Sequence, residues 1–155
     1  MTPTVELRPG DPAPEITVPD VHGTPISLLG LRGTPVALVF LPFAFSEVCG
    51  DEVRELRDSL EDFEQAGVRL LAISCDTVFT LRAWAEREGL GFDLLSDFWP
   101  HGAAARAFGV FDEESGAARR GSFLIDVDGI VRWMVVNPPG KARDLGAYRA
   151  ALAGL

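Results

Sequence analysis

Cys49 is the residue whose type and position most directly suggest chemistry. It follows an apolar run at 36–41 and lies shortly after Ser46, which fits the N-cap of a predicted helix. In the first turn of a helix, a thiol lies close to unpaired backbone N–H groups and to the positive end of the helix dipole. Both favour the thiolate, which is the reactive form of cysteine. This position predicts that Cys49 is a nucleophile.

The pattern after Cys49 also fits a second interpretation. Val53, Leu56, Leu60 and Phe63 recur at helical spacing, and Cys49 belongs to the same apolar stripe. A cysteine on such a stripe is usually a small, inert core residue. The helix position alone therefore leaves both interpretations open.

The segments around Cys49 predict alternating strands and helices. Turn residues and apolar periodicity place an N-terminal hairpin at 15–28 with Gly23 in its turn, and a buried strand at 35–41. A helix from about 46 to 66 ends near Gly67. The remaining predicted elements are a buried strand at 68–74, a helix capped by Asp76 or Thr77 and ending at Gly89, a short strand at 92–96, a helix at 103–108, a hairpin at 121–136 around Asp128-Gly129, a loop at 137–140 and a helix at 144–152.

This order predicts the α/β class, with a mixed central sheet, helices on both faces and an N-terminal β-hairpin. We expect residues 1–155 to form a single domain. Ligands of such sheets bind beyond the carboxyl ends of the parallel strands. The segment 42–49 lies at that edge, where the nucleophile interpretation of Cys49 requires it.

Composition excludes several classes of function. A net charge of −9 argues against binding of nucleic acid or anionic lipid. Residues 1–8 lack the pattern of a signal peptide, and no apolar run approaches transmembrane length. Cys49 and Cys75 are the only cysteines, so we expect a reducing, cytoplasmic location. His22 and His101 do not form a metal-binding pattern, and no metal or other cofactor is expected.

Several motifs resemble those of the peroxiredoxin family. Residues 42–49, Pro-Phe-Ala-Phe-Ser-Glu-Val-Cys, fit the family pattern Pro-x-x-x-Thr/Ser-x-x-Cys, and Glu52 matches the acidic residue that follows. The segment 120–126 is similar to the distal segment that carries the active-site arginine of the family. Residues 95–102 are most similar to those of AhpE-type, one-cysteine peroxiredoxins. The resemblance covers nearly the whole chain and implies a thioredoxin-like fold.

The resemblance implies a thiol-dependent peroxidase for hydrogen peroxide, organic hydroperoxides and peroxynitrite. Cys49 attacks a peroxide oxygen and becomes a sulfenic acid. Arg120 favours the thiolate and binds the peroxide, the Ser46 hydroxyl accepts a hydrogen bond from it, and Pro42 shields the sulfur from water. Glu52 holds the arginine in place, or else is a solvated glutamate near the helix N-terminus.

Cys75 decides how the oxidised enzyme is recycled. It ends the second buried strand at the same sheet edge as Cys49, but it matches no resolving cysteine of the family. We therefore expect Cys75 to be a core residue rather than a resolving one, and an external thiol or a glutaredoxin- or thioredoxin-like protein to reduce Cys49. The family also implies a homodimer, to which Phe43, Phe45 and Trp99 can contribute a surface.

Three other functions can be compared with this one. A thioredoxin-type disulfide oxidoreductase needs two cysteines separated by two residues, and Glu52 occupies the second position. A peroxide sensor or redox relay uses the same Cys49 chemistry but passes the oxidation to a partner protein. A non-catalytic thioredoxin-like binding module predicts an unreactive thiol.

Overall fold

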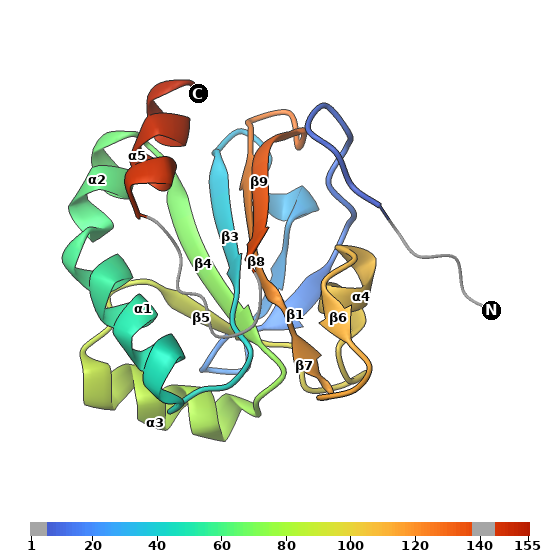
Figure 1. Ribbon diagram of the computed structural model, residues 1–155, viewed down its shortest axis with the longest axis vertical. Coiled ribbons are helices and arrows are strands. Elements are labelled where there is room, and N and C mark those ends of the chain that lie inside the picture. Colours follow the sequence, from blue (N-terminus) through green and yellow to red (C-terminus); the bar gives the residue numbers. More distant parts are fainter. Residues whose placement is uncertain (1–5, 138–144) are drawn as a thin grey trace.

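A five-stranded mixed sheet forms the centre of the computed structural model, which describes residues 6–137 and 145–155 (Figure 1). The strand order is β5-β4-β3-β8-β9. Strands β3, β4 and β5 are parallel, and β8 and β9 add antiparallel strands on the other side of β3. The bounds are β3 Val36–Phe40, β4 Arg69–Ser74, β5 Asp93–Ser96, β8 Arg120–Ile125 and β9 Val131–Asn137.

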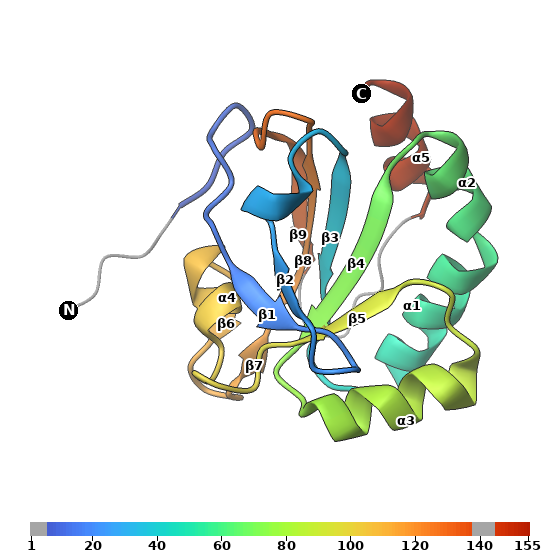
Figure 2. The same cartoon turned by 180° about the vertical axis from the view of Figure 1, so that it is seen from behind.

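Helices and short strands cover both faces of this sheet (Figures 1 and 2). Helices α1, α2, α3 and α5 contribute to one apolar cluster, whereas the β1–β2 hairpin and α4 contribute to a second cluster on the opposite face. The bounds are β1 Thr17–Pro19, β2 Pro25–Ser27, a 3₁₀ helix η1 Leu29–Leu31, α1 Glu47–Asp58, α2 Leu60–Gln65, α3 Val78–Glu88, α4 Ala103–Ala107, β6 Phe111–Asp112, β7 Ala117–Ala118 and α5 Leu145–Ala153.

The central strand β3 shows why the chain folds into these layers. Its successive side chains point to opposite faces of the sheet and enter the two clusters alternately. Val36 and Phe40 pack with β1 and α4, while Ala37 and Val39 pack with α1 and α3. All five residues of the strand are buried. This two-sided burial is the reason that the strand is apolar throughout, as predicted for a parallel strand.

Most of the predicted elements are confirmed. Gly23 has φ +82 in the turn of the β1–β2 hairpin, and Gly129 has φ +81 in the turn between β8 and β9. Helix α3 is capped by Thr77, whose hydroxyl accepts the N–H of Thr80, and it ends at Gly89 in the left-handed region. Of the two proposed caps for α3, the structure therefore selects Thr77 and not Asp76.

The single helix predicted from about 46 to 66 is wrong in one respect. The chain leaves the helical conformation at Ser59, with φ −104 and ψ 7, and α2 then begins as a separate helix. The N–H of Ser59 donates to the carbonyls of Glu55 and Leu56, which closes the last turn of α1. Phe63 still reaches the apolar cluster, so burial of the stripe does not require a continuous helix.

Three short elements lie outside the predicted ones: the 3₁₀ helix η1 and the strands β6 and β7. Strands β6 and β7 form a small hairpin between α4 and β8, but two-residue strands are too short to show an alternating pattern. Asn137 was predicted to begin a loop, but it ends β9. The rest of that predicted loop, 138–140, and residue 144, predicted to begin the terminal helix, lie outside the described residues. Among the described helices, none has both the length and the apolar character needed to cross a membrane.

Candidate active site

Cys49 lies in the first turn of α1, beyond the carboxyl end of β3. The strand pair β3–β4 continues one residue further, because the N–H of Leu41 donates to the carbonyl of Ile73 at 2.8 Å. The chain then turns through residues 42–46 and enters α1. The side chain of Cys49 has no exposed surface and packs in the apolar cluster. Its position agrees with the nucleophile interpretation, while its packing agrees with the apolar stripe.

Ser46 occupies the N-cap position of α1 as predicted, but its hydroxyl does not cap the helix. Its backbone is extended, with φ −71 and ψ 154, and its carbonyl accepts the N–H of Gly50 at 2.8 Å. The hydroxyl instead donates to the carbonyl of Phe43 at 2.9 Å. The oxygen retains acceptor capacity in this arrangement, since a hydroxyl that donates one hydrogen bond still has lone pairs.

The loop at 42–46 has an uncommon backbone conformation. Phe45 has φ +66, in the left-handed region that costs a residue with a side chain about 1–2 kcal/mol. The N–H of Ala44 donates to Oδ2 of Asp76, which follows β4, at 2.8 Å. Such strain persists only where surrounding contacts determine the conformation. The loop that contains Pro42 and Ser46 is therefore held from outside.

Arg120 and Glu52 form a buried ion pair next to the first turn of α1. Arg120 begins β8, and Glu52 lies one helical turn after Cys49, so the pair brings the guanidinium close to the turn that carries the thiol. The exposed fractions are 6% for Arg120 and 2% for Glu52. The alternative of a solvated Glu52 is therefore wrong. Within the described part of the chain, Nε of Arg120 is a buried donor with no hydrogen-bond partner.

Cys75 is buried at the end of β4 and is not bonded to Cys49, so both cysteines are free thiols. Burial, followed by the negative charges of Asp97 and Asp76, raises the pKa of Cys75 to about 12. Burial also raises the pKa of Asp97, although the N–H groups of Ala104 and Ala105 each donate to its carboxylate at 2.9 Å. Cys75 therefore remains a protonated, poorly nucleophilic thiol near neutral pH.

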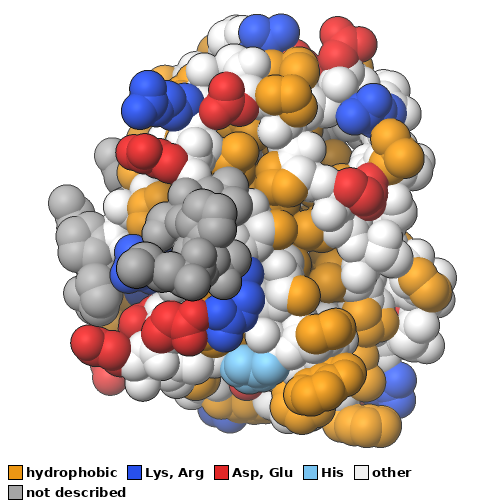
Figure 3. All heavy atoms as spheres, turned by 90° about the vertical axis from the view of Figure 1, so that its right-hand side faces the viewer, with side chains coloured by type: hydrophobic (Ala, Val, Ile, Leu, Met, Phe, Trp, Pro, Cys, Tyr) orange, Lys and Arg blue, Asp and Glu red, His pale blue; other side chains and the backbone are white. Residues whose placement is uncertain are grey.

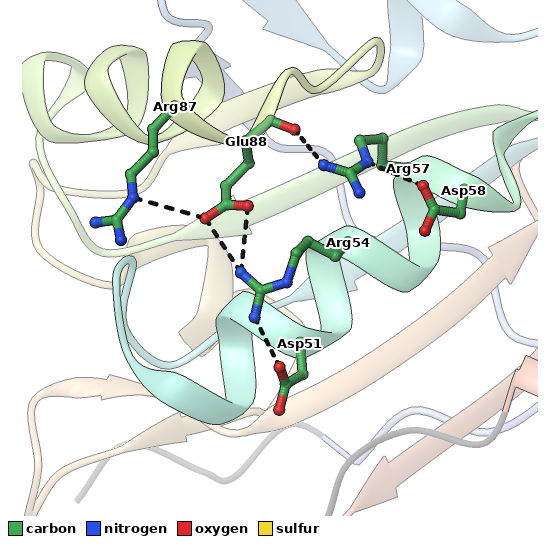
Figure 4. Close-up of polar contacts among 6 residues, drawn as sticks. All are labelled: Asp51, Arg54, Arg57, Asp58, Arg87 and Glu88. Atoms are coloured by element: carbon green, nitrogen blue, oxygen red, sulfur yellow. Dashed lines mark hydrogen bonds and ion pairs between the residues drawn. The ribbon is translucent and has the colours of Figure 1, made fainter.

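Ion pairs fix α1 against α3 (Figure 4). Arg54 of α1 donates to both carboxylate oxygens of Glu88 at 3.2 Å and to Asp51 at 2.7 Å. Arg57 reaches the backbone carbonyl of Glu88 at 2.7 Å. These contacts join the later turns of α1 to the end of α3. They hold the helix that positions Cys49.

Several aromatic side chains near the site are exposed. Phe43 and Phe45 of the loop are about half exposed, and Trp99, which follows β5, is 81% exposed. Trp84 is buried in the core. In Figure 3, hydrophobic side chains gather along the lower part of the face that carries α4.

No group of three potential metal ligands occurs in residues 6–137 and 145–155.

Comparison with known proteins decides the family. The sequence model of the AhpC/TSA family matches residues 9–134. The chain is a peroxiredoxin of this family. The predicted family and the predicted class of enzyme, a thiol-dependent peroxidase, are thereby confirmed.

Relatives of this peroxiredoxin match it over most of its length. It is 44% identical over 150 residues to alkyl hydroperoxide reductase E of Mycobacterium tuberculosis, covering 96% of this chain and 98% of that protein. It is 37% identical over 142 residues to a peroxiredoxin of Thermoplasma volcanium, covering 88% and 68%.

Solved structures confirm the predicted thioredoxin-like fold of this peroxiredoxin. The crystal structure of peroxidoxin BcpB from Mycobacterium tuberculosis superimposes with a TM-score of 0.86 at 29% identity, covering 97% of this chain and 99% of that one. The reduced 2-Cys peroxiredoxin of Plasmodium vivax has a TM-score of 0.86 at 26% identity, with coverage of 96% and 81%.

Two contacts of the site region in this peroxiredoxin were not predicted from its sequence. Asp76 was considered only as a helix cap, yet it binds the loop through Ala44. Its position directly after a parallel strand, at the same sheet edge as Cys49, was the signal that could have identified it. Ser122, two residues after Arg120, shares a buried hydrogen bond with Tyr148 of α5. No local pattern predicts that pair.

Proposed function

We propose that Cys49 is the nucleophile of this peroxidase and that Arg120 binds and polarises the peroxide. The observation that supports this most strongly is the unpartnered Nε donor of Arg120, buried beside the turn that carries Cys49. The Cys49 thiolate attacks one peroxide oxygen, forming the S–O bond as the O–O bond breaks. Sulfur loses two electrons and becomes a sulfenic acid, and the leaving oxygen takes a proton to give water or an alcohol.

The other residues of the motif have supporting roles in this proposal. Ser46 retains an acceptor lone pair for the peroxide proton while it donates to the loop carbonyl of Phe43. Pro42 has no N–H group and presents an apolar ring beside the sulfur. Glu52 fixes the guanidinium of Arg120 by the buried ion pair, which stabilises a charge that otherwise lies unpaired in the interior.

We also propose that an external thiol recycles the enzyme. A thiol condenses with the Cys49 sulfenic acid to give a mixed disulfide and water, and a second thiol then releases reduced Cys49. The burial of Cys75 and its pKa of about 12 argue against a resolving role for this residue. The name thioredoxin peroxidase, given to a relative from Fasciola hepatica that is 36% identical over 148 residues, supports a thioredoxin- or glutaredoxin-like reductant. A reducing, cytoplasmic location is part of the same proposal.

Intact-protein mass spectrometry tests the nucleophile and the recycling step together. One equivalent of hydrogen peroxide is expected to add a single oxygen, which a sulfenic-acid probe traps on Cys49. Cys75→Ser is expected to give the same adduct and the same turnover with a small thiol, because Cys75 stays protonated near neutral pH. A loss of two hydrogens with a Cys49–Cys75 crosslink contradicts the one-cysteine mechanism. Oxidation without turnover, but with transfer to one partner protein, supports the relay instead.

We further propose that residues 1–155 form one domain that assembles as a homodimer through the exposed aromatic residues Phe43, Phe45 and Trp99. The exposure of all three side chains, two of which belong to the catalytic loop, supports this surface. In sedimentation velocity, Trp99→Glu is expected to shift the protein from dimer to monomer, because the interface then contains an unpaired charge. Phe79→Glu alters an aromatic residue that is 73% exposed on α3 and serves as the matched control. A wild-type protein that sediments as a monomer at all concentrations contradicts the dimer.

A further inference from the structure

Asp76 links the catalytic loop to the end of β4. Its Oδ2 atom accepts the N–H of Ala44 at 2.8 Å and the hydroxyl of Ser74 at 2.7 Å. We propose that Asp76 is a positioning residue for the peroxidase site, whose carboxylate holds the 42–46 loop in its reactive conformation. This inference rests on the function proposed above, because it assigns Asp76 a role through Pro42 and Ser46.

The position of Asp76 is itself fixed by two strands. Its N–H donates to the hydroxyl of Ser74 at 3.3 Å, and its carbonyl accepts the hydroxyl of Ser96 at 2.6 Å. Ser74 ends β4 and Ser96 ends β5, and both serines are buried. The carboxylate is therefore anchored to the sheet. Its hydrogen bond to Ala44 holds the loop at a fixed position relative to the sheet.

Aromatic packing and one hydrogen bond connect the loop to the rest of the molecule. The Phe45 ring lies 6.2 Å from the ring of Trp84 and 5.7 Å from the guanidinium of Arg87, both on α3. Among the hydrogen bonds of the described residues, the Ala44–Asp76 bond is the one that joins residues 42–46 to a distant element. Pro42 has no N–H, and the hydroxyl of Ser46 bonds within the loop to Phe43. Phe45 has φ +66, so the loop is also strained. A strained loop persists only where surrounding contacts determine its conformation, and the Ala44–Asp76 hydrogen bond adds a directional contact to the aromatic ones.

Helix capping does not explain the Asp76 side chain. The N-cap of α3 is Thr77, whose hydroxyl accepts the N–H of Thr80. The Asp76 carboxylate points instead to Ala44, which lies midway between Pro42 and Ser46 in the sequence. Loss of the carboxylate is therefore expected to release the two residues that flank the sulfur in the proposed mechanism, while α3 keeps its cap.

Two reactions of Cys49 test whether Asp76 positions the 42–46 loop. Reduction of hydrogen peroxide requires an ordered pocket, and a misplacement of about 1 Å can cost roughly 10²-fold in rate. Alkylation by iodoacetamide requires mainly access to the sulfur, which is fully buried in the closed loop. In Asp76→Ala we expect the rate constant for peroxide to fall roughly 10- to 100-fold and the rate constant for alkylation to rise. General destabilisation also exposes the sulfur, so thermal melting and hydrogen exchange outside the loop serve as the readout that separates the two, and both are expected to stay at wild-type values in Asp76→Ala.

Asp76→Asn is the conservative variant. An asparagine oxygen at the place of Oδ2 still accepts both hydrogen bonds, so this variant is expected to react with peroxide within a few-fold of the wild type. Asp112→Ala is the matched control, because the Asp112 carboxylate also accepts one backbone N–H, from Glu114, and one hydroxyl, from Ser115. Those bonds lie in the β6–β7 turn, and neither reaction of Cys49 is expected to change.

Amide hydrogen exchange at Ala44 tests the hydrogen bond between Ala44 and Asp76 without a measurement of activity. The Ala44 N–H is expected to be protected in the wild type and in Asp76→Asn, and to exchange rapidly in Asp76→Ala.

If Asp76→Ala fails to fold, Ser74→Ala removes the hydroxyl that orients the carboxylate and is expected to show the same changes to a smaller extent. Protection of Ala44 that survives in Asp76→Ala, or equal losses in both reactions, overturns the proposal. If wild-type Cys49 reacts with peroxide no faster than free cysteine, the proposed function fails, whereas exchange and alkylation still decide the role of Asp76.

Discussion

Replacing Cys49 with alanine or serine is expected to lower peroxide reduction by roughly 10⁴-fold or more, a loss of the size seen when catalytic nucleophiles are removed. Alanine removes the sulfur from a fully buried apolar site without adding a polar atom, so the fold is preserved. Serine keeps the approximate shape, but it places a hydroxyl among apolar side chains and offers no thiolate. Loss in both variants therefore reports the chemistry of the sulfur and not a change of packing.

Stopped-flow measurement of peroxide consumption tests this prediction. Cys75→Ser provides the matched control, since it changes the other buried thiol and is expected to keep wild-type rates. Circular dichroism and thermal melting verify that each variant is folded. Continued rapid consumption of peroxide by Cys49→Ala contradicts the assignment of Cys49 as the nucleophile.

Arg120→Met is expected to have the second-largest effect, on both stability and rate. It removes the buried ion pair between Arg120 and Glu52, and breaking a buried pair costs about 3–5 kcal/mol. It also removes the donor proposed to stabilise the leaving oxygen, and loss of one such donor costs roughly 10²–10³-fold in rate. A single variant cannot separate these two effects.

The double variant Arg120→Met with Glu52→Met separates them. Replacing a buried ion pair with apolar residues of similar size is often neutral or stabilising, so the free energy of unfolding is expected to return close to the wild-type value. Peroxide reduction is expected to remain low, because the guanidinium is still absent. Denaturant unfolding measures the first quantity and stopped-flow kinetics the second. Recovery of the peroxide rate in the double variant contradicts a direct role for Arg120.

The parts of the fold with strong local signals were predictable. Strand β3 and the start of α1 are encoded by an apolar run, a proline and an N-cap serine within 36–49, and these also identified Cys49. Gly23 and Gly129 identified the two larger hairpins, because their turns require a positive φ. The order of the elements then placed Cys49 at the functional edge of the sheet.

The remaining features depend on contacts that are distant in the sequence. The break at Ser59 has no signal in the apolar pattern, since the stripe continues through it to Phe63. Glu52 is of a residue type that usually faces water, and its burial is explained by Arg120, 68 positions later. The contact of Asp76 with Ala44 likewise joins two loops that meet because β3 and β4 are neighbours in the sheet. Local periodicity contains no information about such partners.

The complete burial of Cys49 gives the two halves of the catalytic cycle different spatial requirements. A hydroperoxide is a small molecule, whereas a reducing protein of the kind proposed above must bring its own cysteine into covalent contact with the sulfur. For such a reductant we expect the start of α1 to unwind before recycling. Arg54 and Arg57 tie the later turns of this helix to α3, so we expect the unwinding to be confined to residues before Asp51. The stability of this single helical turn is then expected to limit how fast a protein reductant reaches oxidised Cys49.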